Sequence, residues 1–269
     1  MRFIKDTVDP PVDPPAGRKG FNPFARGLSK RRARRRGSLV GFDEIGPDHK
    51  RFTRSGQPLA DKVYETPMSE REKQEMALSL AAANQINRLT DPMTQQPLSE
   101  DHPLAKEYIE NDLFASVGYD GDSSEDAWSA ATVSNLAKSF DPTFEGSARH
   151  SDYIRRGFQN EGPVGYKSEK AKKRTDYQVG DILFKGRKDE FGNPVGPQTF
   201  SQFEKDAKGK GKFGDSSGYG SHSDIITGTG VDEKGKYYEV QGGNVSDKLM
   251  TRRYYAKELG KRYAGRLTQ

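Results

Sequence analysis

Apolar and polar residues follow three different patterns along the chain. Residues 1–64 are rich in Gly, Pro and charge and show no sustained period. Residues 69–156 carry apolar side chains at helical spacing, whereas residues 177–241 contain runs of β-branched and aromatic residues bounded by turn signals. Helices followed by strands predict an α+β fold, with a small antiparallel sheet after the helices. We therefore expect an extended basic arm over 1–64 and one folded domain over 65–269.

Two amphipathic helices are predicted before residue 116. The first begins at a capping box formed by Ser69 and Glu72 and ends before Asp91-Pro92. Its expected inward stripe consists of Met76, Leu80, Ala83 and Ile86. The second spans 103–115, with Leu104, Tyr108, Ile109 and Leu113 expected to face inward. Both helices are more typical of scaffold than of a functional site.

A third helix is predicted from Trp128–Ser129 to about Phe140. The acceptors in 122–126 can cap it, and Trp128, Ala131 and Leu136 are expected on its buried side. Ser129 then lies in the first turn, where free N–H groups and the helix dipole favour developing negative charge. Taken alone, a small residue at a helix start is the simpler interpretation.

A short helix over 147–156 is expected to bury Tyr153 and Ile154. His150 stands near its start, and we interpret it as a structural histidine rather than a catalytic one. The polar segment 160–175 is predicted to be loop.

The strongest β signal is a hairpin that joins residues 223–229 to 236–241 through a Gly-bearing turn. His222 immediately precedes the first strand of this hairpin. Glu239 and Gln241 lie two apart on the second strand, so their side chains share a face. Gly242-Gly243-Asn244 is expected to end that strand in a tight bend.

Other β structure is predicted on both sides of this hairpin. A strand over 177–184 precedes it, separated by a long Gly- and Lys-rich insertion over 185–221 that is typical of a functional or disordered loop. The segment containing Arg252, Arg253, Tyr254 and Tyr255 is expected to add a further strand or short helix.

Composition excludes several classes of protein. The absence of Cys rules out disulfides, thiolate metal sites and thiol catalysis. The four His residues are scattered without metal-ligand spacing, so neither a metal nor another cofactor is expected. No apolar run approaches the length of a membrane span, and the N-terminus lacks the pattern of a secretory signal.

The positive charge of the chain is concentrated in its N-terminal arm. Residues 1–60 hold fourteen Lys/Arg against six Asp/Glu, which leaves thirty against thirty-three in the rest. Residues 18–36 carry nine Lys/Arg and no acid, with Phe21, Phe24 and Leu28 between them. Such a run is typical of a solvated tail, of a docking segment for an acidic protein surface, or of a nucleic-acid contact. The two Phe residues favour a protein partner over nucleic acid.

The order of these features resembles the papain-like cell-wall peptidases of the NlpC and CHAP type. In that superfamily a helix start carries the nucleophile, and a Pro-Gly-Asp-hydrophobic strand follows, which is Val179-Gly180-Asp181-Ile182 here. A His-x-x-hydrophobic strand then supplies the base, and the next strand offers an acidic or amide residue to orient it. The closest resemblance is to a poorly characterised branch. The matching segments here are Trp128-Ser129-Ala130-Ala131, His150-Ser151-Asp152-Tyr153-Ile154 and Glu239-Val240-Gln241-Gly242-Gly243-Asn244. The resemblance covers about residues 115–255 and implies a papain-like fold.

The resemblance also implies roles for particular residues. Ser129 takes the position of the nucleophile, His222 that of the general base, and Glu239 that of the orienting group. Gln241 or Asn244 can share the orienting role or polarise a substrate carbonyl. Most members of the superfamily use Cys, so Ser129 indicates either a serine hydrolase or a domain that has lost its chemistry.

The function expected from the resemblance is a peptidoglycan hydrolase, an amidase or endopeptidase that cuts stem-peptide amides by acyl transfer. A wall substrate combined with no secretory signal favours a bacteriophage virion protein, delivered with the particle and anchored to other virion proteins through residues 18–36. The alternative is a structural virion or assembly protein with an inactive papain-like domain. A third hypothesis is a nucleic-acid-binding protein that acts through the same basic segment.

Overall fold

The computed structural model describes residues 67–159, 166–169, 177–213, 218–259 and 262–267. Its regular helices are α2 (Glu70–Arg88), α3 (Pro103–Tyr108), α4 (Ser129–Phe140), α5 (His150–Gln159) and α6 (Phe200–Ala207). Two irregular turns, η1 (Ile109–Phe114) and η2 (Ala115–Val117), continue α3. The strands are β1 (Tyr166–Glu169), β2 (Ile182–Gly186), β3 (Ser221–Asp232), β4 (Gly235–Gly242), β5 (Met250–Tyr255) and β6 (Tyr263–Leu267). The predicted α+β class is confirmed.

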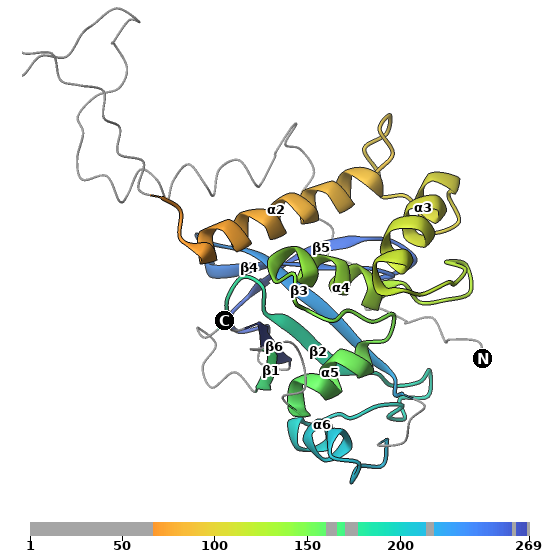
Figure 1. Ribbon diagram of the computed structural model, residues 1–269, viewed down its shortest axis with the longest axis vertical. Coiled ribbons are helices and arrows are strands. Elements are labelled where there is room, and N and C mark those ends of the chain that lie inside the picture. Colours follow the sequence, from red (N-terminus) through yellow and green to blue (C-terminus); the bar gives the residue numbers. More distant parts are fainter. Residues whose placement is uncertain (1–66, 160–165, 170–176, 214–217, 260–261, 268–269) are drawn as a thin grey trace, which may run out of the picture. The chain divides into compact units, whose positions relative to one another are not determined.

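The strands form one antiparallel sheet in the order β1-β6-β2-β3-β4-β5. The predicted hairpin is confirmed as β3 and β4, which are the longest strands and occupy the centre of Figure 1. Its register shifts between Ile226 and Gly228, where a bulge turns the far end of the hairpin.

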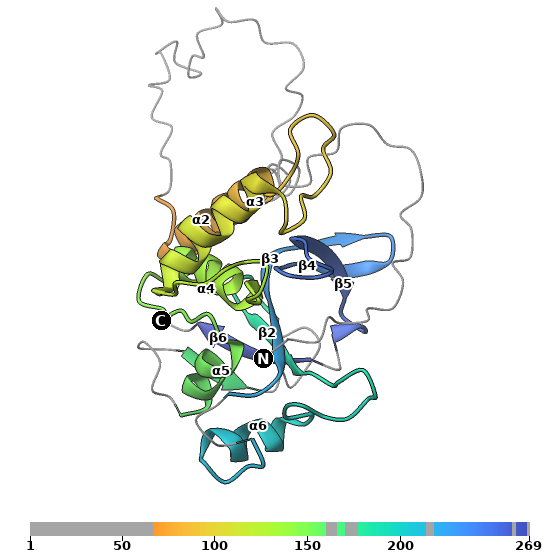
Figure 2. The ribbon, with the colours of Figure 1, turned by 90° about the vertical axis from the view of Figure 1, so that its right-hand side faces the viewer.

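Helices cover one face of the sheet. Leu78 of α2, Val133 of α4, Tyr153 of α5 and Phe203 of α6 belong to one apolar cluster with Ile225 of β3. Figures 1 and 2 show α2 and α4 beside β3, whereas α5 contacts β1 and β3 and α6 packs against α5. The start of α5 lies near the beginning of β3, because the rings of His150 and His222 are 5.6 Å apart, and the start of α4 lies beside it through the contact of Ser129 with His150.

The opposite face of the sheet carries a smaller apolar cluster. Leu183, Ile226 and Val240 contribute to it from three adjacent strands, and Leu259 and Tyr177 pack on them from loops. Side chains of β2 and β3 therefore alternate between two buried layers, which explains the nearly continuous burial of both strands around Ile182 and Ile225.

The predicted inward stripe of α2 is wrong for Met76 and Leu80, whereas Ile86 is partly buried and packs against the apolar cluster around Leu89. Met76 and Leu80 are 38% and 67% exposed, whereas Leu78, Ala82 and Gln85 are fully buried. The Ala-rich sequence allows two apolar faces, and the buried one includes Gln85 because its amide finds polar partners inside the protein.

The second predicted helix is confirmed in extent and partly in orientation. Tyr108, Ile109 and Leu113 are buried, but Leu104 is 54% exposed. The stretch after Tyr108 widens into a π-helical turn, which rotates the later residues relative to an ideal α-helix. A single 3.6-residue period therefore does not predict the buried residues of both α3 and the π-helical turn η1.

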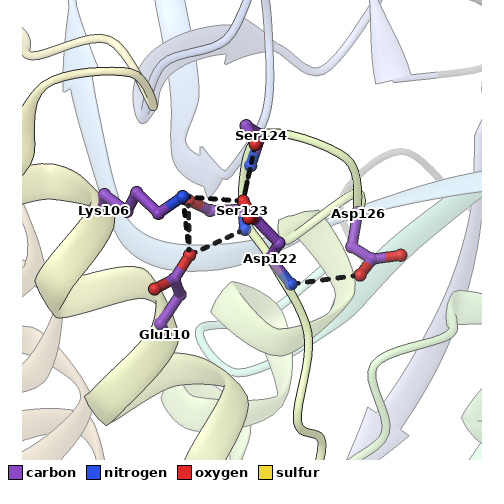
Figure 3. A network of polar contacts seen from close by, with 6 residues as sticks. All are labelled: Lys106, Glu110, Asp122, Ser123, Ser124 and Asp126. Atoms are coloured by element: carbon purple, nitrogen blue, oxygen red, sulfur yellow. Dashed lines mark hydrogen bonds and ion pairs between the residues drawn. The ribbon is translucent and has the colours of Figure 1, made fainter.

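The acceptor run 122–126 does not cap α4. Trp128 is the N-cap residue and makes no side-chain capping bond. Asp122 instead accepts from Lys106 Nζ at 2.9 Å and from the Ser124 hydroxyl at 2.6 Å, and Glu110 accepts from the backbone of Ser123 at 3.1 Å. These contacts, shown in Figure 3, fasten the loop to α3 and η1 and so fix the approach to α4.

Two further predictions need correction. Residues 166–169, expected to be loop, form β1, and the predicted insertion contains α6, which begins with a capping box at Thr199 and Gln202. The C-terminal segment supplies two strands, β5 and β6, of which β6 pairs with both β1 and β2. Strand β1 is short and lacks an apolar alternation, so its existence depends on this long-range pairing.

The predicted basic arm, including its docking segment 18–36, lies outside the described residues. Within the described part, no helix has the length and apolar character needed to cross a bilayer.

Candidate active site

Ser129 is the first residue of α4, and its side chain is engaged by a histidine. Trp128 immediately before it is buried and donates from Nε1 to Glu100 Oε2 at 2.8 Å, which anchors the start of the helix. The Ser129 Oγ lies 2.7 Å from Nε2 of His150, and the serine is 1% exposed. First-turn N–H groups have no acceptor within the helix, so the hydroxyl lies in an electropositive environment.

His150 begins α5 and makes a second hydrogen bond through its other ring nitrogen. Nδ1 is bonded to the hydroxyl of Tyr153, one turn further along the helix. Burial lowers the pKa of His150 well below the ordinary value, and electrostatic interactions with His222 and Arg187 add to this effect. His150 is therefore neutral at pH 7 and has a lone pair on one ring nitrogen. Burial also raises the pKa of Tyr153, which keeps its hydroxyl protonated.

His222, on β3, is the second histidine of the cluster. Its ring centroid is 5.6 Å from that of His150, with the planes at 64°. Nε2 lies 2.9 Å from Oδ1 of Asp224, and the buried Nδ1 has no hydrogen-bond partner in the described part of the chain. Because residues two apart on a strand share a face, the His-x-Asp spacing brings the ring and the carboxylate together.

Asp224 is a buried carboxylate bonded to His222 and Arg262. Burial by itself raises its pKa, but the charges of His222 and Arg262 outweigh that cost and hold the pKa of Asp224 well below its ordinary value. Arg262 Nη1 donates to Oδ2 at 2.6 Å. The side chain is thus an ionised acceptor with both oxygens engaged, and we infer that His222 carries its Nε2 proton toward it.

The imidazole that contacts the Ser129 hydroxyl is that of His150, and the predicted base His222 lies beside His150, with the two ring centroids 5.6 Å apart. The sequence-based interpretation of His150 as only structural does not describe this contact. The catalytic roles of Ser129 and His222 themselves stay predictions.

Glu239 is not the residue that orients His222. It pairs with Gly228, six residues beyond His222 on β3, which at about 3.3 Å per residue is roughly 20 Å along the strand. Its carboxylate accepts from Arg253 Nη2 at 3.2 Å. The separation of seventeen residues between His222 and Glu239 fits a hairpin. In the observed register, however, Glu239 lies opposite the middle of β3, and Asp224 is the carboxylate beside the His222 ring.

Gln241 takes part in a different hydrogen-bond network, and Asn244 follows β4 in a left-handed backbone conformation. Gln241 is fully buried and donates to Gln85 Oε1 at 2.9 Å, while Gln85 donates to Asn135 at 3.0 Å. This amide network joins β4 to α2 and α4. Asn244 has a φ of 52°, a left-handed conformation that suits the bend after β4.

The two glycines of the matching segment have separate packing roles. A Cβ on Gly242 would lie 2.0 Å from Oδ1 of Asp224, and one on Gly243 would lie 2.3 Å from Thr132 Oγ1 and 2.6 Å from the Trp128 ring. Gly242 therefore leaves space for the Asp224 carboxylate, and Gly243 lets β4 approach the first turn of α4. Gly242 and Gly243 therefore contribute to the site by leaving space where a side chain would clash.

Sequence reasoning missed Asp224 and Arg262 as site residues. The His222-x-Asp224 alternation was a usable signal, because both side chains must leave the strand on one side. No local pattern pointed to Arg262, which is thirty-eight residues from its partner. Among the described residues no group of three or more His, Asp or Glu side chains is arranged to hold a metal ion.

Comparison with protein families gives one match. The model of a family described as an uncharacterized protein conserved in bacteria, DUF2272, matches residues 112–262. The chain belongs to the DUF2272 family. Neither the curated proteins nor the solved structures gave a match. The DUF2272 segment runs from η1 to Arg262 and contains Ser129, His150, His222 and Asp224.

Proposed function

We propose that the domain is a hydrolase that cleaves an amide bond by acyl transfer through Ser129. The observation that carries the proposal is the 2.7 Å contact between Ser129 Oγ and His150 Nε2 at the first residue of α4. A serine needs a neighbouring base, because its hydroxyl is not ionised near neutral pH. His150 is neutral and in contact, which meets this requirement.

In this mechanism His150 accepts the hydroxyl proton on Nε2, while its Nδ1–H donates to the oxygen of Tyr153. The free N–H groups of the first turn of α4 are placed to stabilise the oxyanion that forms on the substrate carbonyl. Because Ser129 is 1% exposed, a substrate must displace neighbouring groups to reach it.

For the substrate we propose stem-peptide amides of peptidoglycan, and for the fold a papain-like arrangement. Support comes from the resemblance to cell-wall peptidases in the segments around Ser129, His150 and Gly242-Gly243. It also comes from the order of the structure, a nucleophile-bearing helix followed by an antiparallel sheet whose long strand carries a histidine. We extend the proposal to a location in a bacteriophage particle, with peptidoglycan and other virion proteins as partners.

The test is digestion of purified peptidoglycan by the full-length protein, with released fragments identified by liquid chromatography and mass spectrometry. We expect the wild-type protein to release fragments with new amino termini and Ser129→Ala to release none. Ser134→Ala is the matched control, because Ser134 is a buried serine of the same helix whose hydroxyl donates to the Ser147 carbonyl at 3.0 Å. Equal activity in wild type and Ser129→Ala would refute the proposal.

The burial of Ser129 favours a second candidate, a structural virion or assembly protein with an inactive domain. A serine that is 1% exposed is also expected in a domain that has lost its catalytic activity. This candidate predicts that a fluorophosphonate probe, which reacts with activated serines, does not label the wild-type protein. Labelling of wild type and Ser134→Ala, but not of Ser129→Ala, would rule it out.

A further inference from the structure

His222 has one ring nitrogen held by an ion pair and the other left without a protein partner. Nε2 faces Asp224, which is in turn fixed by Arg262 at 2.6 Å. Nδ1 is buried without a hydrogen bond in the described part of the chain, and the residue as a whole is 6% exposed. Leaving a buried polar atom unpaired costs free energy, so such an atom calls for a functional explanation.

The two histidines differ in the groups that hold them. His150 is bonded to two neutral hydroxyls, those of Ser129 and Tyr153. His222 is bonded to an ionised carboxylate. A carboxylate partner stabilises an imidazolium, whereas neutral partners in a buried site favour the uncharged ring. Two titratable groups in such different environments are suited to separate acid and base roles.

We infer that the two histidines divide the proton transfers of the proposed hydrolase, with His150 serving Ser129 and His222 serving the leaving group through Nδ1. Asp224 and Arg262 act as positioning residues that keep Nε2 of His222 hydrogen-bonded, so that Nδ1 is the nitrogen that transfers the proton. This inference rests on the proposed function and names the second half of its acid–base machinery.

In the acylation step, the Ser129 oxygen forms a bond to the substrate carbonyl carbon and its proton moves to Nε2 of His150. The carbon–nitrogen bond breaks as the proton on Nδ1 of His222 moves to the leaving nitrogen, which departs as a neutral amine. The acyl-enzyme then holds a protonated His150 and a neutral His222.

In the deacylation step, water attacks the acyl carbon and gives a proton to Nδ1 of His222. The bond from the carbon to Ser129 Oγ breaks, and Oγ takes back the proton from Nε2 of His150. One amide and one water yield one acid and one amine, and both rings return to their starting protonation states.

The experiment compares a reaction that needs a proton on the leaving group with one that does not. Fluorophosphonate labelling of Ser129 expels fluoride, which departs without general acid catalysis, whereas peptidoglycan amide cleavage expels an amine. His222→Gln keeps an amide near Asp224 but has no proton-donating ring nitrogen. We expect it to retain the labelling rate and to lower amide cleavage by about 10²- to 10⁴-fold.

His150→Gln is the contrasting variant and is expected to lose both labelling and amide cleavage, because the Ser129 proton then has no acceptor. Asp224→Asn is expected to follow His222→Gln, with kcat for amide cleavage reduced more than the labelling rate. A merely structural role of Asp224 would instead lower both by the same factor. Each variant is checked for folding by its thermal unfolding midpoint.

Two results would overturn the division of roles: amide cleavage at the wild-type rate in His222→Gln, or loss of labelling in a folded His222→Gln protein. The second result would make His222 the base for Ser129. If His222→Gln does not fold, His222→Asn provides the same comparison. Failure of the wild-type protein to label at all is a distinct outcome that refutes the proposed function and this inference with it.

Discussion

Nε2 of His222 and Oδ1 of Asp224 lie 2.9 Å apart on the same strand, and Arg262 closes the other side of the carboxylate. The contact is built from a two-residue spacing on β3 and one long-range ion pair. Because all three side chains are buried or nearly so, the charges are little screened, and each depends on its neighbours for stabilisation.

Replacing Asp224 with Asn should therefore destabilise the fold. The change leaves Arg262 buried without its counter-charge, which we expect to lower the free energy of unfolding by about 3 kcal/mol. Urea denaturation followed by circular dichroism measures it. Asp232→Asn is the control, since its pair with Arg253 is partly exposed and should contribute much less to the free energy of unfolding. Similar losses in the two variants would contradict the assigned importance of burial.

Gly242→Ala should disturb the histidine cluster without removing any polar group. Its Cβ would lie 2.0 Å from Asp224 Oδ1, and the carboxylate cannot move away without weakening its contacts to His222 or Arg262. We expect a fall in amide cleavage together with a lower unfolding temperature. Gly235→Ala is a useful comparison, because it meets no neighbour within 4 Å but has a φ of 106°. Gly235→Ala should change the unfolding temperature and leave the rate of amide cleavage unchanged.

The buried His150 should make stability depend on pH. Its folded-state pKa is lowered by burial, then by His222 and Arg187, so the unfolded chain binds a proton that the folded chain rejects between that lowered value and about 6.5. This contribution to stability is complete above about pH 6.5 and is lost as the pH falls below it. The pKa of Asp224 is also lowered, but its contribution disappears only below its ordinary value of 3.8.

Thermal unfolding measured between pH 8 and pH 5 tests this dependence. We expect the wild-type unfolding temperature to fall over this range and the fall to be smaller in His150→Gln, which has no imidazole to protonate. If the unfolding temperature of His150→Gln fell as steeply with pH as that of the wild type, groups other than His150 would govern the pH dependence.

The amide network of Gln85 and Gln241 offers a test of the interior. Gln241→Leu removes the donor to Gln85 and leaves a buried amide oxygen short of a partner, which should cost about 1–3 kcal/mol in denaturant unfolding. The double variant Gln85→Leu/Gln241→Leu removes both groups and should be less destabilised than the sum of the two single variants. Simple additivity would mean that the two amides do not act together.

The candidate site was accessible to sequence reasoning only in part. Ser129 was found because a helix start is a local feature, and His222 because turn and strand signals defined the β3–β4 hairpin. His150 was visible within a matching segment, but its role depends on a contact with a serine twenty-one residues earlier, on another helix. Glu239 was assigned the orienting role and Asp224 was not considered, because hairpin spacing alone does not fix which residues oppose one another.

The sequence by itself determined which segments form helices and strands where the signals are local: α4 to Phe140, the burial of Tyr153 and Ile154, and the β3–β4 hairpin. The tertiary structure alone decided which face of α2 is buried, that residues 166–169 pair with β6, and that Arg262 reaches Asp224. Local propensity and periodicity arise from neighbours in the chain, whereas the register of strands and the partners of buried charges depend on residues brought together only by folding.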